Sequence, residues 1–220
     1  MELANACELY RDAGFFGQPA NGVTSLALVA CGVAIAVDRK RGGRGPLPYA
    51  LLVVAVGAGS LVQHGPNPDW QAYAHDLPLA TLLAYVAADA ASDLRRRNVS
   101  PAWWLAVPVL MVPVVAAGPT ASSLTQGALA GVAIGFNLLR ARRRPWLRRT
   151  LIGSTLILGA GALVGTIGDR TSLCQPESVL QGHAFWHVMA ALALWALAPA
   201  IGRREEPASR QPTAAATRPV

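Results

Sequence analysis

The sequence has little charge. Only 14% of its 220 residues are Asp, Glu, Lys or Arg, whereas 53% belong to the hydrophobic class. A soluble globular domain carries about 25% charged residues, so this composition excludes an ordinary soluble protein and indicates a membrane protein. The net charge of +7 does not indicate nucleic-acid binding, because the arginines form short clusters between apolar runs, without interleaved aromatic residues.

Lysine and cysteine are scarce as well. The single lysine, Lys40, lies between apolar runs, which excludes a retinal pigment because that chemistry needs a Schiff-base lysine inside the helix bundle. The three cysteines, Cys7, Cys31 and Cys174, are too few for a cysteine-bound zinc site and allow at most one disulfide. The first twenty residues lack a basic segment followed by an apolar core, so no cleavable signal peptide is expected.

Seven apolar runs approach or reach the length that crosses a bilayer as a helix, which is about 20 mainly apolar residues. They predict an all-α integral membrane protein, a seven-transmembrane helix bundle in one domain, residues 1–202. The tail at 203–220, rich in Arg, Pro, Thr and Ala, is expected to be disordered and cytoplasmic. The predicted spans are roughly 20–37, 46–64, 73–91, 102–118, 121–139, 149–167 and 180–202.

The basic residues predict the orientation of this bundle. Every lysine and arginine except Arg11 and Arg170 follows the first, third, fifth or seventh run. Because cytoplasmic loops carry the excess of basic residues, the N-terminus is expected outside and the C-terminus in the cytoplasm of a cell with a plasma or inner membrane. Six or eight spans would break this alternation.

All four histidines fall near run ends that this topology places on the non-cytoplasmic side. Ser60 and His64 are four residues apart and therefore share one helix face, as do His183 and His187 in the last run, while Asp76 begins the third. Three imidazoles with one open position are the ligand set of a catalytic zinc. A lone histidine at a helix end is usually an interfacial residue, but ionisable residues gathered within the membrane favour a metal site.

Haem is the other metal cofactor to consider, since histidine is a common axial ligand. Haem held between His64 and His183 would leave His187, Ser60 and Asp76 without explanation. The sequence therefore favours zinc.

Three elements of the sequence resemble the CREST superfamily of seven-helix membrane hydrolases, which includes alkaline ceramidases, proteins that remodel GPI anchors, and the progestin and adiponectin receptors. The elements are Ser60-Leu61-Val62-Gln63-His64, His75-Asp76 and His183-Ala184-Phe185-Trp186-His187. The closest likeness is to the alkaline ceramidases, through Cys7-Glu8, Gln18-Pro19-Ala20-Asn21 and Gln181-Gly182-His183. The resemblance implies that His64, His183 and His187 bind zinc, with Ser60 and Asp76 as catalytic partners.

The same resemblance implies two features near the N-terminus. One is a calcium site, of which only Glu8 is clearly matched, with Asn5 as a second candidate, so calcium is doubtful as a cofactor. The other is a disulfide between Cys7 and Cys174, which the predicted topology also places together on the oxidising side. Cys31 lies within the first span and is expected to remain a buried thiol.

These residues predict a zinc-dependent membrane hydrolase that cleaves an amide or ester bond of a membrane lipid, similar to a ceramidase. Asp76 would accept the proton of the attacking water and Ser60 would donate a hydrogen bond to the oxyanion, unless the serine bonds back to its own helix. His75 is either a residue that supports the site or, as we favour, an interfacial one. The alternative function is a zinc-containing lipid receptor or sensor of the progestin and adiponectin receptor type, without turnover.

Overall fold

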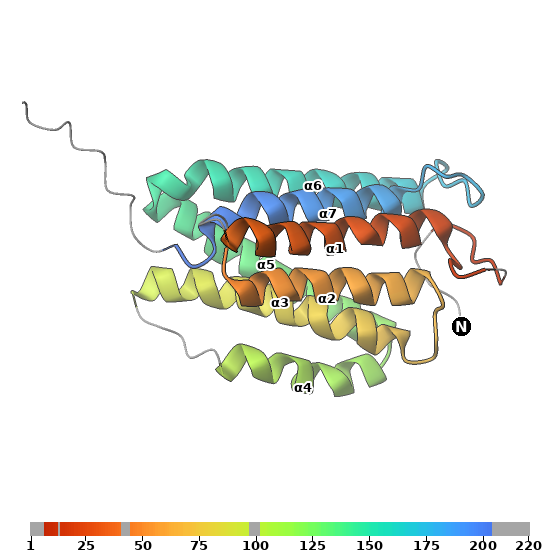
Figure 1. The fold of residues 1–220 in the computed structure, drawn as a ribbon, viewed down its shortest axis with the longest axis horizontal. Helices are drawn as coiled ribbons and strands as arrows, with labels where there is room; N and C mark the ends of the chain where they lie inside the picture. Colours follow the sequence, from red (N-terminus) through yellow and green to blue (C-terminus); the bar gives the residue numbers. More distant parts are fainter. Residues whose placement is uncertain (1–6, 13, 41–44, 97–101, 204–220) are drawn as a thin grey trace, which may run out of the picture.

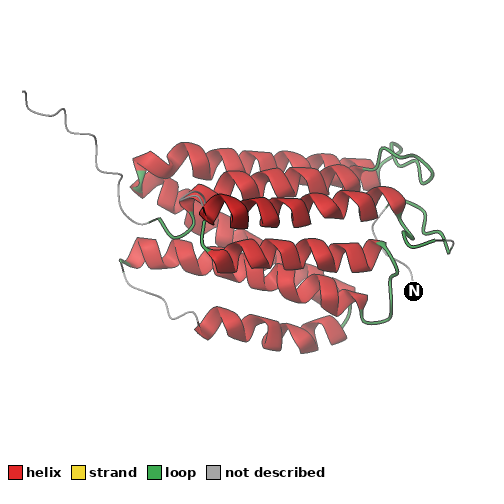
Figure 2. Ribbon diagram, viewed as in Figure 1, coloured by secondary structure: helices red, strands yellow, loops and turns green. Residues whose placement is uncertain are grey.

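The computed structural model describes residues 7–12, 14–40, 45–96 and 102–203. Within these ranges every regular element is a helix, which confirms the all-α class (Figure 2). The helices are α1 (Pro19–Lys40), α2 (Leu47–His64), α3 (Gln71–Arg95), α4 (Ala102–Ala116), α5 (Pro119–Arg143), α6 (Arg148–Arg170) and α7 (Gly182–Leu197), with 3₁₀ turns η1 (Pro145–Leu147) and η2 (Ala198–Ala200). Of the predicted tail at 203–220, only Arg203 lies inside the described residues.

Six of these helices are long and apolar enough to cross a membrane, namely α1, α2, α3, α5, α6 and α7, the last two counted with their adjoining 3₁₀ turns. The helix α4 has 15 residues, which span about 22 Å against a hydrocarbon core of about 30 Å. It lies within the predicted fourth span, 102–118, and contains Pro108 and Pro113. The helices fit a multi-pass membrane protein, while the seventh span and the orientation remain predictions.

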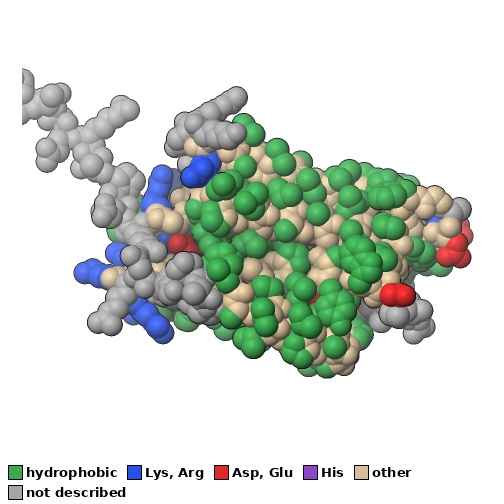
Figure 3. Space-filling view, turned by 60° about the horizontal axis from the view of Figure 1, so that its bottom comes forward, with side chains coloured by type: hydrophobic (Ala, Val, Ile, Leu, Met, Phe, Trp, Pro, Cys, Tyr) green, Lys and Arg blue, Asp and Glu red, His purple; other side chains and the backbone are tan. Residues whose placement is uncertain are grey.

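The six long helices form a closed ring. Each packs against its neighbour in the order α1, α2, α3, α5, α6, α7, and α7 packs against α1 (Figure 1). The helix α4 lies outside this ring against α3, at the lower edge of Figure 1. Apolar side chains cover the middle of the face shown in Figure 3. Large apolar side chains are also highly exposed on several helices, among them Val109, Leu110, Leu124, Leu156 and Leu163. Such a surface suits a lipid environment, because apolar side chains make no favourable contacts with water that lipid would replace.

Two glycines let α2 lie unusually close to both of its neighbours. A Cβ atom on Gly57 would lie 2.6 Å from the backbone nitrogen of Val29 in α1, and one on Gly59 would lie 2.0 Å from the carbonyl oxygen of Ala74 in α3. Any side chain at these positions would therefore push the helices apart. The close packing fixes the end of α2 that carries His64.

A disulfide joins Cys7 to Cys174 and ties the N-terminal segment to the loop before α7. This is the pairing expected from the sequence. The backbone nitrogen of Leu9 also donates to the carbonyl oxygen of Pro176, at 3.0 Å. Cys31 is a buried free thiol within α1. The N-terminal segment is thus held across the end of the bundle where α2 ends and α7 begins, which we call the histidine end.

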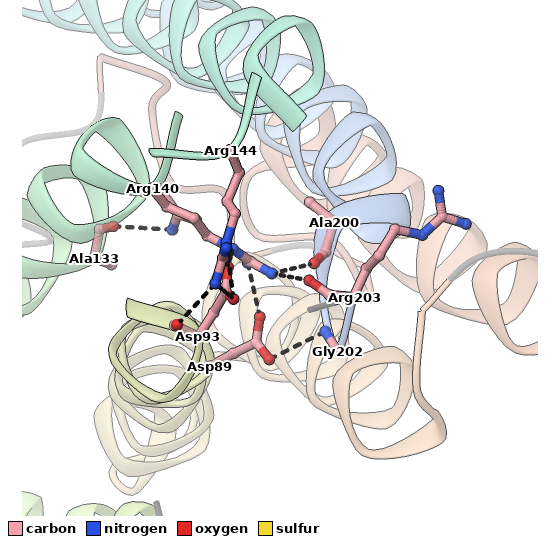
Figure 4. Close-up of polar contacts among 9 residues, drawn as sticks. Asp89, Asp93, Ala133, Arg140, Arg144, Ala200, Gly202 and Arg203 are labelled. Carbon is pink, nitrogen blue, oxygen red and sulfur yellow. Dashed lines mark hydrogen bonds and ion pairs between the residues drawn. The ribbon is translucent and has the colours of Figure 1, made fainter. Parts of the chain in front are cut away.

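The opposite end of the bundle carries most of the described basic side chains (Figure 3) and contains a buried ion network (Figure 4). Arg140, 0% exposed, donates from Nε to Asp93 Oδ2 at 2.6 Å and from Nη1 to Asp89 Oδ2 at 3.0 Å. Its Nη2 donates to the carbonyl oxygens of Ala200 and Arg203. In the sequence Arg140 counts among the basic residues that follow the fifth apolar run. The structure places it within α5 and inside the bundle, where it links α3, α5 and the end of α7.

Replacing Arg140 by methionine should lower the free energy of unfolding by about 3–5 kcal/mol, because the carboxylate of Asp89 would lose its bond to this guanidinium and the buried Asp93 would keep only its pair with Arg144. Reversible unfolding in mixed detergent micelles measures this change. Arg143→Met is the matched control, since Arg143 is exposed on the same helix and its replacement should cost less than about 0.5 kcal/mol. Equal effects of the two substitutions would show that the network does not hold these helices together.

Candidate metal centre

Three imidazoles converge at the histidine end. His64 is the last residue of α2, and His183 and His187 occupy the first two turns of α7. The ring centroids are 5.0 Å apart for His64 and His183, 5.2 Å for His64 and His187, and 4.7 Å for His183 and His187. One nitrogen from each ring lies within 4.8 Å of the others, so this group can hold a metal ion. It is the histidine set that the family resemblance implied.

The ring of His64 is oriented by Gln18, which precedes α1. Gln18 Nε2 donates to the carbonyl oxygen of Glu8 at 2.7 Å, so its Oε1 faces His64 Nδ1, at 2.6 Å. An amide oxygen only accepts, and the neutral ring therefore carries its proton on Nδ1 and has its lone pair on Nε2. Among the described residues, the buried Nε2 has no hydrogen-bond partner. A buried acceptor without a donor, in the centre of an imidazole triad, fits a bound metal ion.

His187 is oriented in the same way by α1. Its Nδ1 lies 3.1 Å from the carbonyl oxygen of Asn21 and 3.1 Å from Thr24 Oγ1. The Thr24 hydroxyl donates to the carbonyl oxygen of Ala20 at 2.7 Å, so both oxygens near Nδ1 act as acceptors. The ring proton therefore sits on Nδ1, and Nε2 is left with its lone pair, as in His64.

His183 lies beside a carboxylate. Its Nδ1 is 3.7 Å from Asp169 Oδ2, at the end of α6. A carboxylate or carbonyl oxygen on the far side of a metal-binding ring fixes its orientation and raises its basicity. Each of the three imidazoles thus has an oxygen next to its Nδ1, supplied by a different part of the chain.

Ser60 faces the triad and does not bond back to its own helix. Its Oγ lies 3.2 Å from His187 Nε2 and 2.9 Å from Ser25 Oγ. Ser25 donates its own proton to the carbonyl oxygen of Asn21, at 2.8 Å, so its oxygen can accept from Ser60. The Ser60 hydroxyl, 1% exposed, is therefore a donor held beside the imidazoles.

Asp76 is held between α3 and α5. Its Oδ1 lies 2.7 Å from His75 Nδ1, and its Oδ2 accepts from Ser122 Oγ at 2.5 Å. Gln126 Nε2 donates in turn to Ser122 Oγ at 3.0 Å. His75 therefore contacts the proposed catalytic carboxylate, which favours its role as a supporting residue over the interfacial role that we preferred from the sequence.

Two cavities meet at the triad. A polar cavity of about 710 Å³ opens at the histidine end and is lined by His64, Asp76 and Asp169, among others. A largely apolar cavity of about 440 Å³ begins at Ser60 and His187 and continues between α3, α5, α6 and α7. His183 lines both cavities. The imidazoles therefore lie at the junction between a polar space and an apolar one.

Glu8, the proposed calcium ligand, caps a helix. Its Oε1 accepts from the backbone nitrogen of Ala20 at 2.7 Å and its Oε2 from that of Asn21 at 2.9 Å, in the first turn of α1. A carboxylate at a helix N-terminus satisfies two otherwise unpaired N–H groups and suits the helix dipole. Asn5, the second calcium candidate, lies outside the described residues.

The residues that orient the imidazoles were missed by the sequence analysis. Gln18 was quoted only as part of a segment that resembles the alkaline ceramidases, without a role at the histidines, and Thr24, Ser25 and Asp169 were not singled out. These residues have no regular sequence spacing from the histidines, because they lie on α1, on α6 and in the segment before α1, whereas the histidines lie on α2 and α7. Only packing brings them to the triad.

Comparison with protein-family models and with curated proteins found no match. The likeness to the CREST superfamily therefore rests on the residues and motifs named above.

The purified protein should contain about one zinc ion per chain, and changing both His183 and His187 to alanine should remove it, because a single imidazole holds zinc poorly. Elemental analysis of protein purified without chelators measures this. His75→Ala is the control variant and should keep its zinc, since His75 Nδ1 bonds to Asp76. Wild-type protein without zinc, or equal zinc loss in the control, would contradict the assigned ligand set.

Gln18→Leu should weaken zinc binding about 10–100-fold, because His64 would lose the acceptor that fixes its proton on Nδ1. Competition with a coloured chelator gives the affinity. Gln126→Leu removes an amide that bonds to Ser122 and should leave the zinc affinity unchanged. If Gln18→Leu matches the wild type, Gln18 does not orient the metal ligand.

Proposed function

We propose that this protein is a zinc-dependent membrane hydrolase that cleaves an amide or ester bond of a lipid, as a ceramidase does. The observation that carries the proposal is the position of the imidazole triad at the junction of a polar and an apolar cavity. An amphiphile that fills both cavities has its headgroup on one side of the triad and its chain on the other. The bond that joins them then lies beside the imidazoles.

His64, His183 and His187 would hold the zinc ion, since three neutral imidazoles with an open position are the ligand set of catalytic zinc. When bound, the ion supplies a Lewis acid and a source of hydroxide at neutral pH, because it lowers the pKa of bound water from about 15.7 to about 7. His64 and His187, whose Nδ1 protons are held by acceptors, would bind the ion through Nε2.

The protein's own groups supply the rest of the chemistry. The apolar cavity falls in the range of about 300–1,000 Å³ that ligand sites occupy, and it excludes water from the chain of the lipid. The Ser60 hydroxyl, at the start of that cavity, donates to the oxygen of the substrate carbonyl as negative charge develops there. Asp76, in the polar cavity, accepts the proton of the attacking water and returns it to the leaving group.

The alternative is a lipid receptor or sensor without turnover. Both oxygens of Asp76 already accept hydrogen bonds, from His75 and Ser122, and a carboxylate used in this way has a structural role in a binding site. The positive-inside pattern supports a site on the non-cytoplasmic side in either case.

Asp76→Asn should keep zinc but lower turnover about 10²–10⁴-fold, because the amide keeps the size of the carboxylate and cannot accept a proton. His64→Ala should lose both zinc and turnover. The assay offers a panel of N-acyl and ester lipids in detergent and follows released fatty acid. Wild-type turnover in Asp76→Asn would refute the base role, and a zinc-loaded wild type inactive on every lipid would favour the receptor.

A further inference from the structure

The cavity that begins at the imidazoles is polar again at its far end. Asn137 of α5 and Ser154 and Thr155 of α6 line it there. The helices α5 and α6 are joined by the short turn η1, and Asn137 and Ser154 each lie six residues from that connection, about 9 Å along their helices. These side chains therefore lie at the same level of the bundle, one turn from the buried Arg140.

The polar groups at this end keep acceptor oxygens available. Asn137, 5% exposed, donates from Nδ2 to the carbonyl oxygen of Ala133 at 2.9 Å. Its Oδ1 is buried and has no partner among the described residues. The hydroxyls of Ser154 and Thr155 both donate to the carbonyl oxygen of Leu151, at 3.0 Å and 2.8 Å.

Both hydroxyl protons and one of the two N–H donors of Asn137 are thus used within their own helices, and the oxygens of all three side chains remain available. Buried polar atoms are almost always paired, so an enclosed acceptor without a donor indicates that a ligand or a water molecule supplies one. A hydroxyl group has the required O–H donor. A carboxylate has no donor and would find only the second N–H of Asn137 among acceptor oxygens, while a methyl group would leave Asn137 Oδ1 unsatisfied.

The length of the cavity defines where on a lipid chain such a hydroxyl would lie. Ser123, which lines both cavities near His75, and Asn137 are fourteen residues apart on α5, about 21 Å. A saturated chain advances about 1.25 Å per carbon when its C–C bonds are about 1.5 Å long at tetrahedral angles. The distance corresponds to roughly 16 carbons, the length of a long fatty acyl chain.

We propose that the far end of this cavity is a hydroxyl-binding subsite, formed by Asn137, Ser154 and Thr155, and that the preferred lipid carries a hydroxyl at or near the end of an acyl chain of about 16 carbons. This proposal rests on the proposed function in placing the scissile bond at the imidazoles. The middle of the cavity, lined by residues such as Ala130, Ile134 and Leu158, receives the methylenes. The two polar ends then define the orientation and the length of the chain.

Binding to the full-length wild-type protein in detergent tests the subsite without any need for turnover. The probes are hexadecanoic acid, 16-hydroxyhexadecanoic acid and hexadecanedioic acid, compared by calorimetric titration. The hydroxy acid should bind about 10-fold more tightly than the plain acid, the effect of one buried hydrogen bond, and the diacid should bind most weakly. Equal affinities for the plain and hydroxy acids would overturn the proposal.

Asn137→Leu should abolish the preference for the hydroxy acid without weakening the plain acid, and Thr155→Val should reduce it if the leucine variant does not fold. Two control variants should keep the preference. Ile134→Leu changes an apolar side chain that lines the same cavity. Thr125→Val removes a hydroxyl that donates to the carbonyl oxygen of Ala121 in its own helix, as the Thr155 hydroxyl does to that of Leu151. A preference that survives both Asn137→Leu and Thr155→Val would overturn the subsite and assign the Asn137 acceptor to water.

The hydrolysis assay separates this proposal from the proposed function. Release of plain and 16-hydroxy acyl chains at equal rates, with equal binding of the free acids, would refute the subsite and leave the hydrolase intact. A clear binding preference for the hydroxy acid in a zinc-loaded protein that hydrolyses neither lipid would support the subsite and refute the hydrolase.

Discussion

The geometry of the histidine triad depends on the hydrogen bond between Gln18 and His64. The three imidazoles come from α2 and α7, which are far apart in the sequence, and neither helix alone can bring them within 4.8 Å. The N-terminal segment connects them, because Gln18 holds His64 while the Cys7–Cys174 disulfide anchors the same segment just before α7. Glu8 strengthens this connection by accepting from the first turn of α1 and from the amide of Gln18. A change in the N-terminal segment is therefore transmitted directly to a metal ligand.

The bundle is held by polar contacts at both ends and by close packing between them. At one end the imidazoles are joined to α1 and α6 through Asn21, Thr24 and Asp169. At the other end the guanidinium of Arg140 joins α3 and α5 to the end of α7. Because lipid gives apolar helices little reason to pack against one another, such buried hydrogen bonds and small-residue contacts determine their register. They also hold the helices that line the long cavity between α3, α5, α6 and α7.

The polar groups of the two cavities lie at their ends and at the junction between them. The polar cavity has carboxylates and amides, the triad and Ser60 lie at the junction, and the middle of the apolar cavity is lined by apolar side chains. Its far end offers mainly acceptor oxygens. A polar group of an amphiphile placed in the apolar part of the cavity would lose its hydration without gaining a hydrogen-bond partner, which costs free energy. An apolar group placed in the polar cavity would gain nothing. In the proposed function, this arrangement would define both the direction in which the lipid lies and the bond that reaches the imidazoles.

The amino-acid sequence by itself determined the helices and the candidate ligands, because these depend on local order. Long apolar runs form helices wherever the backbone must satisfy its own hydrogen bonds, and a spacing of four residues places Ser60 with His64, and His183 with His187, on one face. The tertiary structure alone decided which residues orient the rings, that Arg140 is buried, that α4 is short and peripheral, and that Asn137 lines the apolar cavity. No regular spacing in the sequence predicts these features. The partner of a polar side chain depends on which helix packs beside it and on how the two helices are shifted along their axes. That choice depends on contacts such as those of Gly57 and Gly59, which join residues distant in the chain.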